Sequence, residues 1–271
     1  MPELPEVETT RRGIEPHVLG QIVQGVVVRQ TQLRWPVPEN LEQKLKGKPI
    51  QSLLRRGKYI LFIVEGGALM VHLGMSGNLR ITPTNEPLKK HDHIDILLAD
   101  GLSLRYHDPR RFGCMLWVEG DPSAHPLLAE LGPEPFDGQF TGEYLHQAGH
   151  GRISAVKSLI MDSHIVVGVG NIYANEALFR AGIDPRRAAG KIGLKRYARL
   201  VKLVQEVLGQ AIAQGGTTLR DFVNANGKPG YFQQTLAVYG REGEPCLLCG
   251  TPIRSVRLAQ RSTFYCPRCQ H

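Results

Sequence analysis

The sequence predicts an α+β fold in two domains: an N-terminal antiparallel β-sandwich with a helix before it, and a C-terminal helical domain ending in a four-cysteine β-hairpin. Short apolar runs separated by turn residues occupy residues 21–119, which is typical of a β domain. Helical periodicity takes over between 141 and 214, and two Cys-x-x-Cys pairs follow near the end of the chain. A turn-rich connector at 125–138 separates the two patterns, so we expect the domain boundary there.

The first domain is expected to begin with a helix over residues 5–19. Glu6 and Glu8 lie in its first turn, where the helix dipole favours acidic side chains, and Gly13 and Pro16 are expected to weaken its end. Seven strands should follow, because seven segments are short apolar, β-branched or aromatic runs. They are 22–29, 50–55, 58–64, 68–73, 94–99, 102–106 and 114–119. This number and spacing favour a sandwich or a barrel.

The second domain is expected to be helical, with helices at 141–147, 154–162, 171–181 and 194–214. The turn Gly168-Val-Gly-Asn171 leads into the third of them. A glycine turn at a helix N-terminus can bind a phosphate through main-chain N–H groups. The sequence lacks the longer glycine fingerprint and the preceding βαβ unit of a dinucleotide site, so we exclude a nucleotide cofactor.

The composition is that of a globular protein with an anionic partner. The chain has 271 residues, 42% of them hydrophobic, with a formal net charge of +8 and an isoelectric point near 9.4. This basic balance favours binding to nucleic acid. No apolar run approaches the roughly 20 residues that span a bilayer, and the acidic, proline-rich N-terminus is unlike a signal peptide. We therefore expect no membrane association and a cytoplasmic location, where thiols stay reduced.

The cysteine spacing predicts a metal site. Cys246 and Cys249 form one Cys-x-x-Cys pair, Cys266 and Cys269 form the other, and residues 250–265 between them are long enough for a β-hairpin. Two disulfides or four unrelated thiols are the alternatives, but paired Cys-x-x-Cys motifs at this spacing favour one structural Zn²⁺ with four thiolate ligands. The hairpin and its flank also carry arginines, which favours a nucleic-acid contact. They are Arg254, Arg257, Arg261 and Arg268.

The N-terminus contains a candidate nucleophile. Removal of Met1 would expose the nitrogen of Pro2 as a secondary amine. An α-amino group has a pKa of about 7.7–8.0, so a useful fraction is unprotonated at neutral pH. Attack of that amine on an aldehyde-level carbon gives an iminium, which is an electron sink for elimination. Glu3 is adjacent and can donate or accept a proton. A frayed terminus without a function is the alternative.

Three further stretches contain candidate functional residues. The segment from Asp108 to Gly113 combines arginine and phenylalanine on a tight turn, which suits stacking on bases and contacts with their edges. Met75 lies in a glycine-bounded turn. His91 and His93 are expected on one strand face, but without a third ligand they do not predict a metal site.

These motifs occur in a fixed order along the chain. They are Met1-Pro-Glu-Leu-Pro-Glu-Val-Glu-Thr9, His72-Leu-Gly-Met-Ser-Gly77, Lys90-His-Asp-His93, Asp108-Pro-Arg-Arg-Phe-Gly113, Gly168-Val-Gly-Asn-Ile-Tyr173 and the four-cysteine hairpin. The set spans residues 2–269 and resembles the bacterial formamidopyrimidine-DNA glycosylase family. The resemblance implies base-excision repair of oxidised purines in double-stranded DNA. The enzyme would remove 8-oxoguanine and formamidopyrimidines as an N-glycosylase, then cut the strand as an AP lyase by β,δ-elimination.

The resemblance also implies roles for individual residues in catalysis. Pro2 would attack C1′ of the damaged nucleotide and form the iminium, and Glu3 would donate a proton to the sugar. Lys58 would donate the proton in β-elimination, and Arg261 would serve δ-elimination. The target base has to leave the stack before C1′ can be reached, which leaves a void and an unpaired cytosine.

Other positions are implied to contact DNA. Met75 and Phe112 would fill the void as apolar wedges, and Arg110 would offer planar donors to the cytosine. The remaining implied contacts are His91, Arg152, Lys157 and Asn171, with Arg152 in a stretch that departs from the lysine-rich run of relatives. The segment from Gly215 to Tyr231 resembles a lid over the extruded purine, with Arg220 where relatives often have lysine.

The expected domains are a catalytic β-sandwich at 1–130, a helix-two-turn-helix domain at 131–225 that includes part of the lid, and a zinc hairpin at 236–271. We expect a monomer in the bacterial cytoplasm, associated with the nucleoid. Two alternatives stay open: the sister endonuclease VIII family, which prefers oxidised pyrimidines, and a non-catalytic zinc protein that binds DNA. The motif Leu4-Pro-Glu-Val-Glu8 and the set of Met75, Arg110 and Phe112 argue against the first. Pro2, Glu3 and Lys58 argue against the second.

Overall fold

The computed structural model describes residues 2–215 and 236–271. These residues fall into two compact units: the first ends at Ala129, and the second comprises Glu130–Ala213 and the C-terminal segment. Nearly all of the expected lid segment, including Arg220, lies outside the described residues. In the described part of the chain, no helix is long and apolar enough to cross a membrane.

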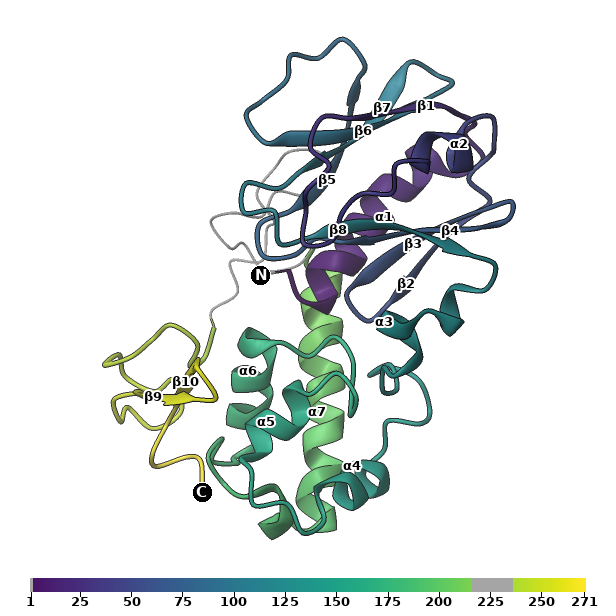
Figure 1. The fold of residues 1–271 in the computed structure, drawn as a ribbon. Coiled ribbons are helices and arrows are strands. Elements are labelled where there is room, and N and C mark those ends of the chain that lie inside the picture. The colour runs from purple at the N-terminus through teal and green to yellow at the C-terminus, as the bar shows by residue number, and fades with distance from the viewer. Residues whose placement is uncertain (1, 216–235) are drawn as a thin grey trace. The chain divides into compact units, whose positions relative to one another are not determined.

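The first unit is a sandwich of two four-stranded antiparallel sheets, with strand orders β1-β6-β7-β5 and β2-β3-β4-β8 (Figure 1). The strands are β1 (Val23–Val28), β2 (Ser52–Arg56), β3 (Tyr59–Val64), β4 (Gly67–His72), β5 (Asn78–Pro83), β6 (Asp92–Leu98), β7 (Leu102–His107) and β8 (Cys114–Glu119). Residues of alternate strand positions fill one hydrophobic core between the sheets. The predicted β-sandwich is therefore confirmed.

Helix α1 (Leu4–Val18) closes one side of this sandwich. It contacts β2 and β5, which are outer strands of the two sheets, and it lies between the sheets in Figure 1. Val7, Ile14 and Val18 enter the core. The helix runs on through Pro16, because a proline in the last turn removes only one terminal hydrogen bond.

Strand β5 and helix α2 of the first unit, like the short helical turns before its end at Ala129, are missing from the sequence prediction, and one residue was misplaced. Strand β5 follows the glycine-bounded turn directly and ends in Pro83, so its composition does not predict a strand. Its pairing with β7 makes it one. The short helix α2 (Leu41–Leu45) has only two buried residues. His91 precedes β6 in a left-handed conformation, φ 76°, and is not on the strand, so the expected shared strand face with His93 was wrong.

The second unit is helical. Its helices include α4 (Gly142–Gly149), α5 (Val156–Met161), α6 (Asn171–Ala181) and α7 (Leu194–Ala213), and short helical turns occur at Pro122–Ala124, Pro126–Ala129 and Ala189–Lys191 on either side of the unit boundary. Helix α6 is the centre of the unit, because it is buried on most sides and contacts α5, α7 and β10. Gly182 ends it in the left-handed conformation that glycine adopts without strain.

The C-terminal hairpin pairs β9 (Arg254–Leu258) with β10 (Arg261–Tyr265). Ala259 and Gln260 form its turn with positive φ angles of 43° and 63°, as a tight two-residue hairpin requires. Among the residues that the structure describes, a small apolar cluster that includes Phe179 of α6 packs against the hairpin. Such a small core favours stabilisation by a metal.

Candidate functional site

The N-terminal residues are anchored to α1. Pro2 is buried, and Glu3 is the N-cap residue of the helix with only 3% of its surface exposed. The N–H of Glu3 donates to Oε2 of Glu6 at 2.8 Å, the return bond of a capping box. The folded N-terminus therefore presents the Pro2-Glu3 pair in a defined place, unlike a frayed end.

Lys58 lies in the turn between β2 and β3. Hydrogen bonds of Arg55 connect this turn to α1. Glu8 of α1 accepts a hydrogen bond from Nε of Arg55 at 3.0 Å, and Arg55 also donates to the carbonyl of Gly57 at 2.9 Å. Burial alone would raise the pKa of Glu8. Hydrogen bonds from neighbouring arginines, Arg11 first, lower the pKa by more than burial raises it, so the net shift is downward. An ionised Glu8 thus connects the helix after Pro2 to the turn that carries Lys58.

His72 is the neutral neighbour of Lys58. Burial, and then the charges of Lys58 and Arg34, lower the pKa of His72 to about 4. Its Nδ1 accepts a hydrogen bond from the N–H of Gly74 at 3.0 Å, so the ring proton is on Nε2. At neutral pH His72 adds no positive charge beside Lys58.

The three predicted void-filling residues come from two loops of the first unit. Met75 lies between β4 and β5 with 37% of its surface exposed, and Phe112 lies between β7 and β8 with 46% exposed. The guanidinium of Arg110 lies over the Phe112 ring at 4.9 Å, a cation–π contact. Exposed apolar side chains at loop tips next to an arginine are suited to enter a gap in a base stack.

His91 lies near these loops, beside two other histidines. Its ring centroid is 6.0 Å from that of His93 and 6.1 Å from that of His107. Burial, then the charges of Lys90 and the two histidines, lower the pKa of His91. A half-exposed, mostly neutral imidazole can donate to a phosphate without repelling the basic residues around it.

In the second unit, Lys157, Asn171 and Arg261 are brought together by the hairpin. Lys157 is 2% exposed, and its Nζ donates to the Ser262 carbonyl at 3.0 Å and to Oγ1 of Thr263 at 2.7 Å. Asn171, the first residue of α6, donates to the same carbonyl at 3.0 Å. Arg261 and Lys157 both line a pocket of about 170 Å³. This places two cations and an amide around the start of β10.

Arg152 lies in the turn that follows α4. It is exposed, and its carbonyl accepts a hydrogen bond from the N–H of Gly190 at 2.9 Å. The guanidinium is near Tyr197, whose pKa is raised to about 12 by burial although the charge of Arg152 opposes the shift. The side chain is thus accessible to an anion.

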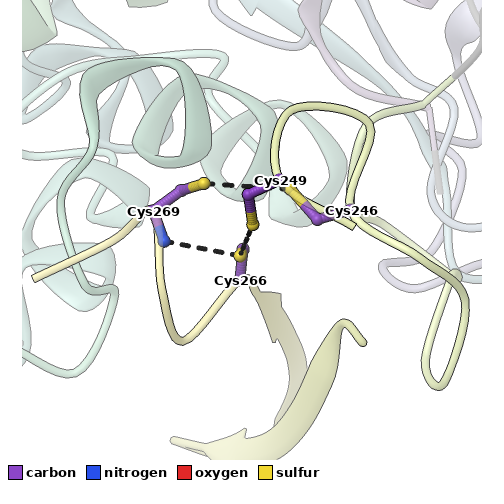
Figure 2. Close-up of side chains that lie close together, drawn as sticks. All are labelled: Cys246, Cys249, Cys266 and Cys269. Carbon is purple, nitrogen blue, oxygen red and sulfur yellow. Dashed lines mark hydrogen bonds between the residues drawn. The ribbon is translucent and has the colours of Figure 1, made fainter. Parts of the chain in front are cut away.

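The four cysteines of the hairpin point toward one another (Figure 2). Their sulfur atoms all lie within 4.8 Å of each other, with 3.5 Å between Cys249 and Cys266 and 3.9 Å between Cys246 and Cys269. Four sulfurs at this spacing, from two tight turns, fit the tetrahedral coordination of one Zn²⁺. A donor set made only of thiolates leaves no open position, as expected of a structural site.

Family models match almost the whole chain. The formamidopyrimidine-DNA glycosylase N-terminal domain matches residues 1–115, the H2TH domain of the same enzyme matches 131–223, and a zinc finger found in FPG and IleRS matches 243–271. The chain belongs to the formamidopyrimidine-DNA glycosylase family. The predicted helix-two-turn-helix domain and the single zinc site of the hairpin are confirmed as features of this family.

Individual relatives agree with the family assignment. A formamidopyrimidine-DNA glycosylase of Methylococcus capsulatus is 60% identical over 270 residues, covering 100% of both chains. The MutM (Fpg) protein of Thermus thermophilus superposes with a TM-score of 0.88 at 41% identity, covering 99% of this chain and 98% of that one. Lactococcus lactis Fpg, solved in complex with DNA containing an abasic site, gives a TM-score of 0.92 at 33% identity, covering 99% of each chain.

Sequence reasoning assigned no role to several buried polar residues. Asp108 and Ser76 lie inside the motifs that carry the family resemblance, but their burial is seen only in the structure. Asn175, 0% exposed on α6, had no local signal at all. Cys114, to which no role was assigned, is 0% exposed in β8, and burial raises the pKa of its thiol to about 11.

Proposed function

We propose that the protein is a bifunctional DNA glycosylase and AP lyase that removes oxidised purines from double-stranded DNA in base-excision repair. Membership of the formamidopyrimidine-DNA glycosylase family over the whole chain carries the proposal. The Pro2-Glu3 pair at the start of α1 supplies the nucleophile and the proton donor. We further propose that it works as a monomer in the bacterial cytoplasm, on DNA of the nucleoid.

The first step is displacement of the base. Removal of Met1 leaves Pro2 as a secondary amine, since its nitrogen is otherwise an amide without a nucleophilic lone pair. The nitrogen bonds to C1′ as the glycosidic bond breaks, and the base leaves with its electron pair and takes a proton. Glu3 donates a proton to the sugar ring oxygen, so the ring opens to an iminium.

Strand cleavage follows from the iminium. Its positive charge acidifies the C2′ proton, and loss of that proton expels the 3′ phosphate in β-elimination; a second elimination expels the 5′ phosphate. Lys58 serves proton transfer in the first elimination. Arg261 serves the second by holding the departing phosphate through its planar donors. Hydrolysis of the final iminium returns the proline amine.

DNA is held by the basic and polar residues of both units. We assign backbone contacts to His91, Arg152, Lys157 and Asn171. Met75, Arg110 and Phe112 are assigned to the void that the extruded base leaves, with Arg110 facing the unpaired cytosine. The zinc ion supplies no chemistry to the reaction and stabilises the hairpin that carries Arg261.

The decisive experiment traps the iminium. The zinc-loaded protein is incubated with a duplex carrying one 8-oxoguanine opposite cytosine, and borohydride is added to reduce the iminium to a stable tertiary amine. We expect a covalent protein–DNA adduct that is lost in Pro2→Gly and in a protein with extra residues before Pro2. Pro5→Ala is the matched control, because it changes a nearby proline without touching the amine, and it should still form the adduct.

Two results would contradict the proposal in different ways. If folded, zinc-loaded protein forms no adduct, it is not a lyase of this kind. If the adduct forms much faster on a duplex with an oxidised pyrimidine than on the 8-oxoguanine duplex, the chemistry stands but the substrate class is that of the endonuclease VIII family.

A further inference from the structure

The void-filling residues lie on two separate loops, yet their task requires fixed positions. Met75 belongs to the β4–β5 loop, whereas Arg110 and Phe112 belong to the β7–β8 loop. A side chain that enters a base stack has to be held within a fraction of an ångström of its productive place. One buried carboxylate lies where the two loops meet. It belongs to Asp108, which is 0% exposed.

The carboxylate of Asp108 accepts hydrogen bonds from both loops. Oδ1 accepts from the hydroxyl of Ser76, next to Met75, at 2.9 Å. Oδ2 accepts from the N–H of Gly113, next to Phe112, at 2.9 Å, and from the hydroxyl of Tyr106 at 3.1 Å. Each bond is to an ionised acceptor away from water, where hydrogen bonds are stronger than neutral, exposed ones.

Ser76 also extends the connection to Arg110. The Arg110 N–H donates to Oγ of Ser76 at 3.3 Å, while the same hydroxyl donates its own proton to Asp108. The main chain that carries the guanidinium is therefore bonded to the loop of Met75 through one hydroxyl. A serine in this position both accepts and donates, and no aliphatic side chain can replace it.

The main chain of Asp108 joins a third segment to the same point. Its N–H donates to the carbonyl of His91 at 3.2 Å, and its carbonyl accepts from Nε2 of His93 at 2.9 Å and from the N–H of Arg111 at 3.2 Å. Because a carbonyl only accepts, Nε2 of His93 carries a proton. All four residues of the first unit assigned to DNA thus lie on segments bonded to Asp108 or to its partner Ser76.

Close main-chain packing makes this junction rigid. A Cβ added at Gly74 would lie 2.3 Å from the main-chain nitrogen of Gly113 and 2.4 Å from the carbonyl carbon of Phe112. A Cβ added at Gly113 would lie 2.0 Å from the hydroxyl of Tyr106. The two loops therefore meet main chain against main chain at glycines that leave no room for a side chain.

We propose that Asp108 is a positioning residue that, with Ser76, holds the loops of Met75, Arg110 and Phe112 as one preorganised unit for base extrusion and for selection of the unpaired cytosine. The proposal rests on the proposed function of those three residues. Tyr106 supports it, because burial, and then the charge of Asp108, raise the pKa of Tyr106 well above 10 and keep it a donor.

The test compares two buried serines. Ser76→Ala removes the bridge, and Ser103→Ala is the matched control, because Ser103 is also buried in the same sandwich (0% exposed, against 5% for Ser76) and its hydroxyl is 3.5 Å from the Thr82 carbonyl. Loss of one such hydrogen bond corresponds to roughly five- to tenfold in rate. We expect Ser76→Ala to slow single-turnover excision of 8-oxoguanine by that factor and to weaken the preference for cytosine over adenine opposite the lesion.

A second readout separates positioning from general stability. A preformed abasic site has no base to extrude, so Ser76→Ala should change its cleavage by less than about twofold. Asp108→Asn should show the same selective loss, larger in size, because its amide presents a donor where the native oxygens meet only donors. If either variant slows abasic-site cleavage as much as excision, the role is merely structural and the proposal is wrong.

A double-mutant cycle identifies the residue through which Ser76 acts. In an Arg110→Ala background, Ser76→Ala should weaken the preference for cytosine over adenine by less than about twofold further, because the group assigned to the cytosine is gone while Met75 and Phe112 remain. Additive effects would overturn the proposal. If Arg110→Ala itself leaves excision and base preference intact, the assignment of Arg110 fails and the positioning role fails with it. If Arg110→Ala is slow but Ser76→Ala and Asp108→Asn match Ser103→Ala, only the positioning role fails.

Discussion

At the scale of single residues, His72 shows how burial sets a protonation state beside the proposed catalytic lysine. Its folded-state pKa is about 4, and the ordinary value is 6.5. The unfolded chain binds a proton at His72 more tightly than the folded protein does. The free energy of unfolding is therefore undiminished by this group above pH 6.5 and falls as the pH drops from 6.5 through 4. At pH 5 the loss amounts to about 2 kcal/mol.

We predict that His72→Gln reduces the loss of unfolding free energy at acid pH. A glutamine accepts a hydrogen bond but does not titrate, so the difference in unfolding free energy between pH 7 and pH 5 should be about 2 kcal/mol smaller than in the native protein. Denaturant unfolding, followed by tryptophan fluorescence at both pH values, measures it. An NMR titration that places the ring pKa of folded His72 near 6.5 would refute the explanation.

Residue types that carry chemistry are visible in a sequence, whereas the residues that position them are not. The four cysteines could be assigned because only one arrangement satisfies four thiolates at that spacing. Pro2 was only a candidate on its own chemistry, which requires a chain terminus, and its role is what the family resemblance implies. The hydrogen bonds of Asp108 join positions 76, 91 and 113, and no local pattern shows which distant N–H or hydroxyl a buried carboxylate will accept.

At the scale of elements, Asn175 of α6 fixes the zinc hairpin to the helical unit. Its Oδ1 accepts the N–H of Phe264 in β10 at 2.8 Å, and its Nδ2 donates to the Asn171 carbonyl at 2.6 Å. Asn175→Ala leaves an N–H of β10 without its partner, which costs on the order of 1–2 kcal/mol. We expect amide exchange in β10 to accelerate about tenfold or more while β3 and β4 stay protected.

Hydrogen-exchange mass spectrometry on the zinc-loaded protein measures this. Gln205→Ala is the control, because Gln205 also donates an amide hydrogen bond within the second unit, to the Pro135 carbonyl at 2.8 Å, but from α7. If the two variants change exchange in β10 equally, Asn175 is not the anchor. A local effect confined to Asn175→Ala would identify α6 as the support for the strand that begins with Arg261.

Elements with a strong local period could be predicted, and elements defined by pairing could not. Helix α6 was expected at 171–181 and forms there, because a glycine precedes it and Gly182 follows it. Strand β8 likewise matches its expected bounds. Strand β5 has four residues between a turn and Thr82-Pro83, and it becomes a strand only because β7 pairs with it along its full length.

At the scale of the whole molecule, the net charge of +8 makes DNA affinity depend on salt. Each phosphate that the protein neutralises adds about −0.9 to the slope of log affinity against log salt concentration. Arg261→Ala should make that slope less negative by about one unit, if Arg261 holds a phosphate. A duplex with a tetrahydrofuran site is the suitable probe, because its C1′ carries neither a base nor a hydroxyl, so Pro2 has no group to displace and forms no covalent bond.

Loss of charge alone has to be separated from loss of a contact. Lys202→Ala removes the same charge from an exposed position on α7, where Lys202 is 77% exposed and pairs only loosely with Glu206 at 3.8 Å. We expect its slope to equal that of the native protein, because a cation outside the DNA interface releases no counterion on binding. Equal slopes for Arg261→Ala and the native protein would remove Arg261 from the phosphate contacts. Equal reductions in both variants would show that only the overall field of the protein acts on DNA, because a local contact changes the slope at Arg261 alone.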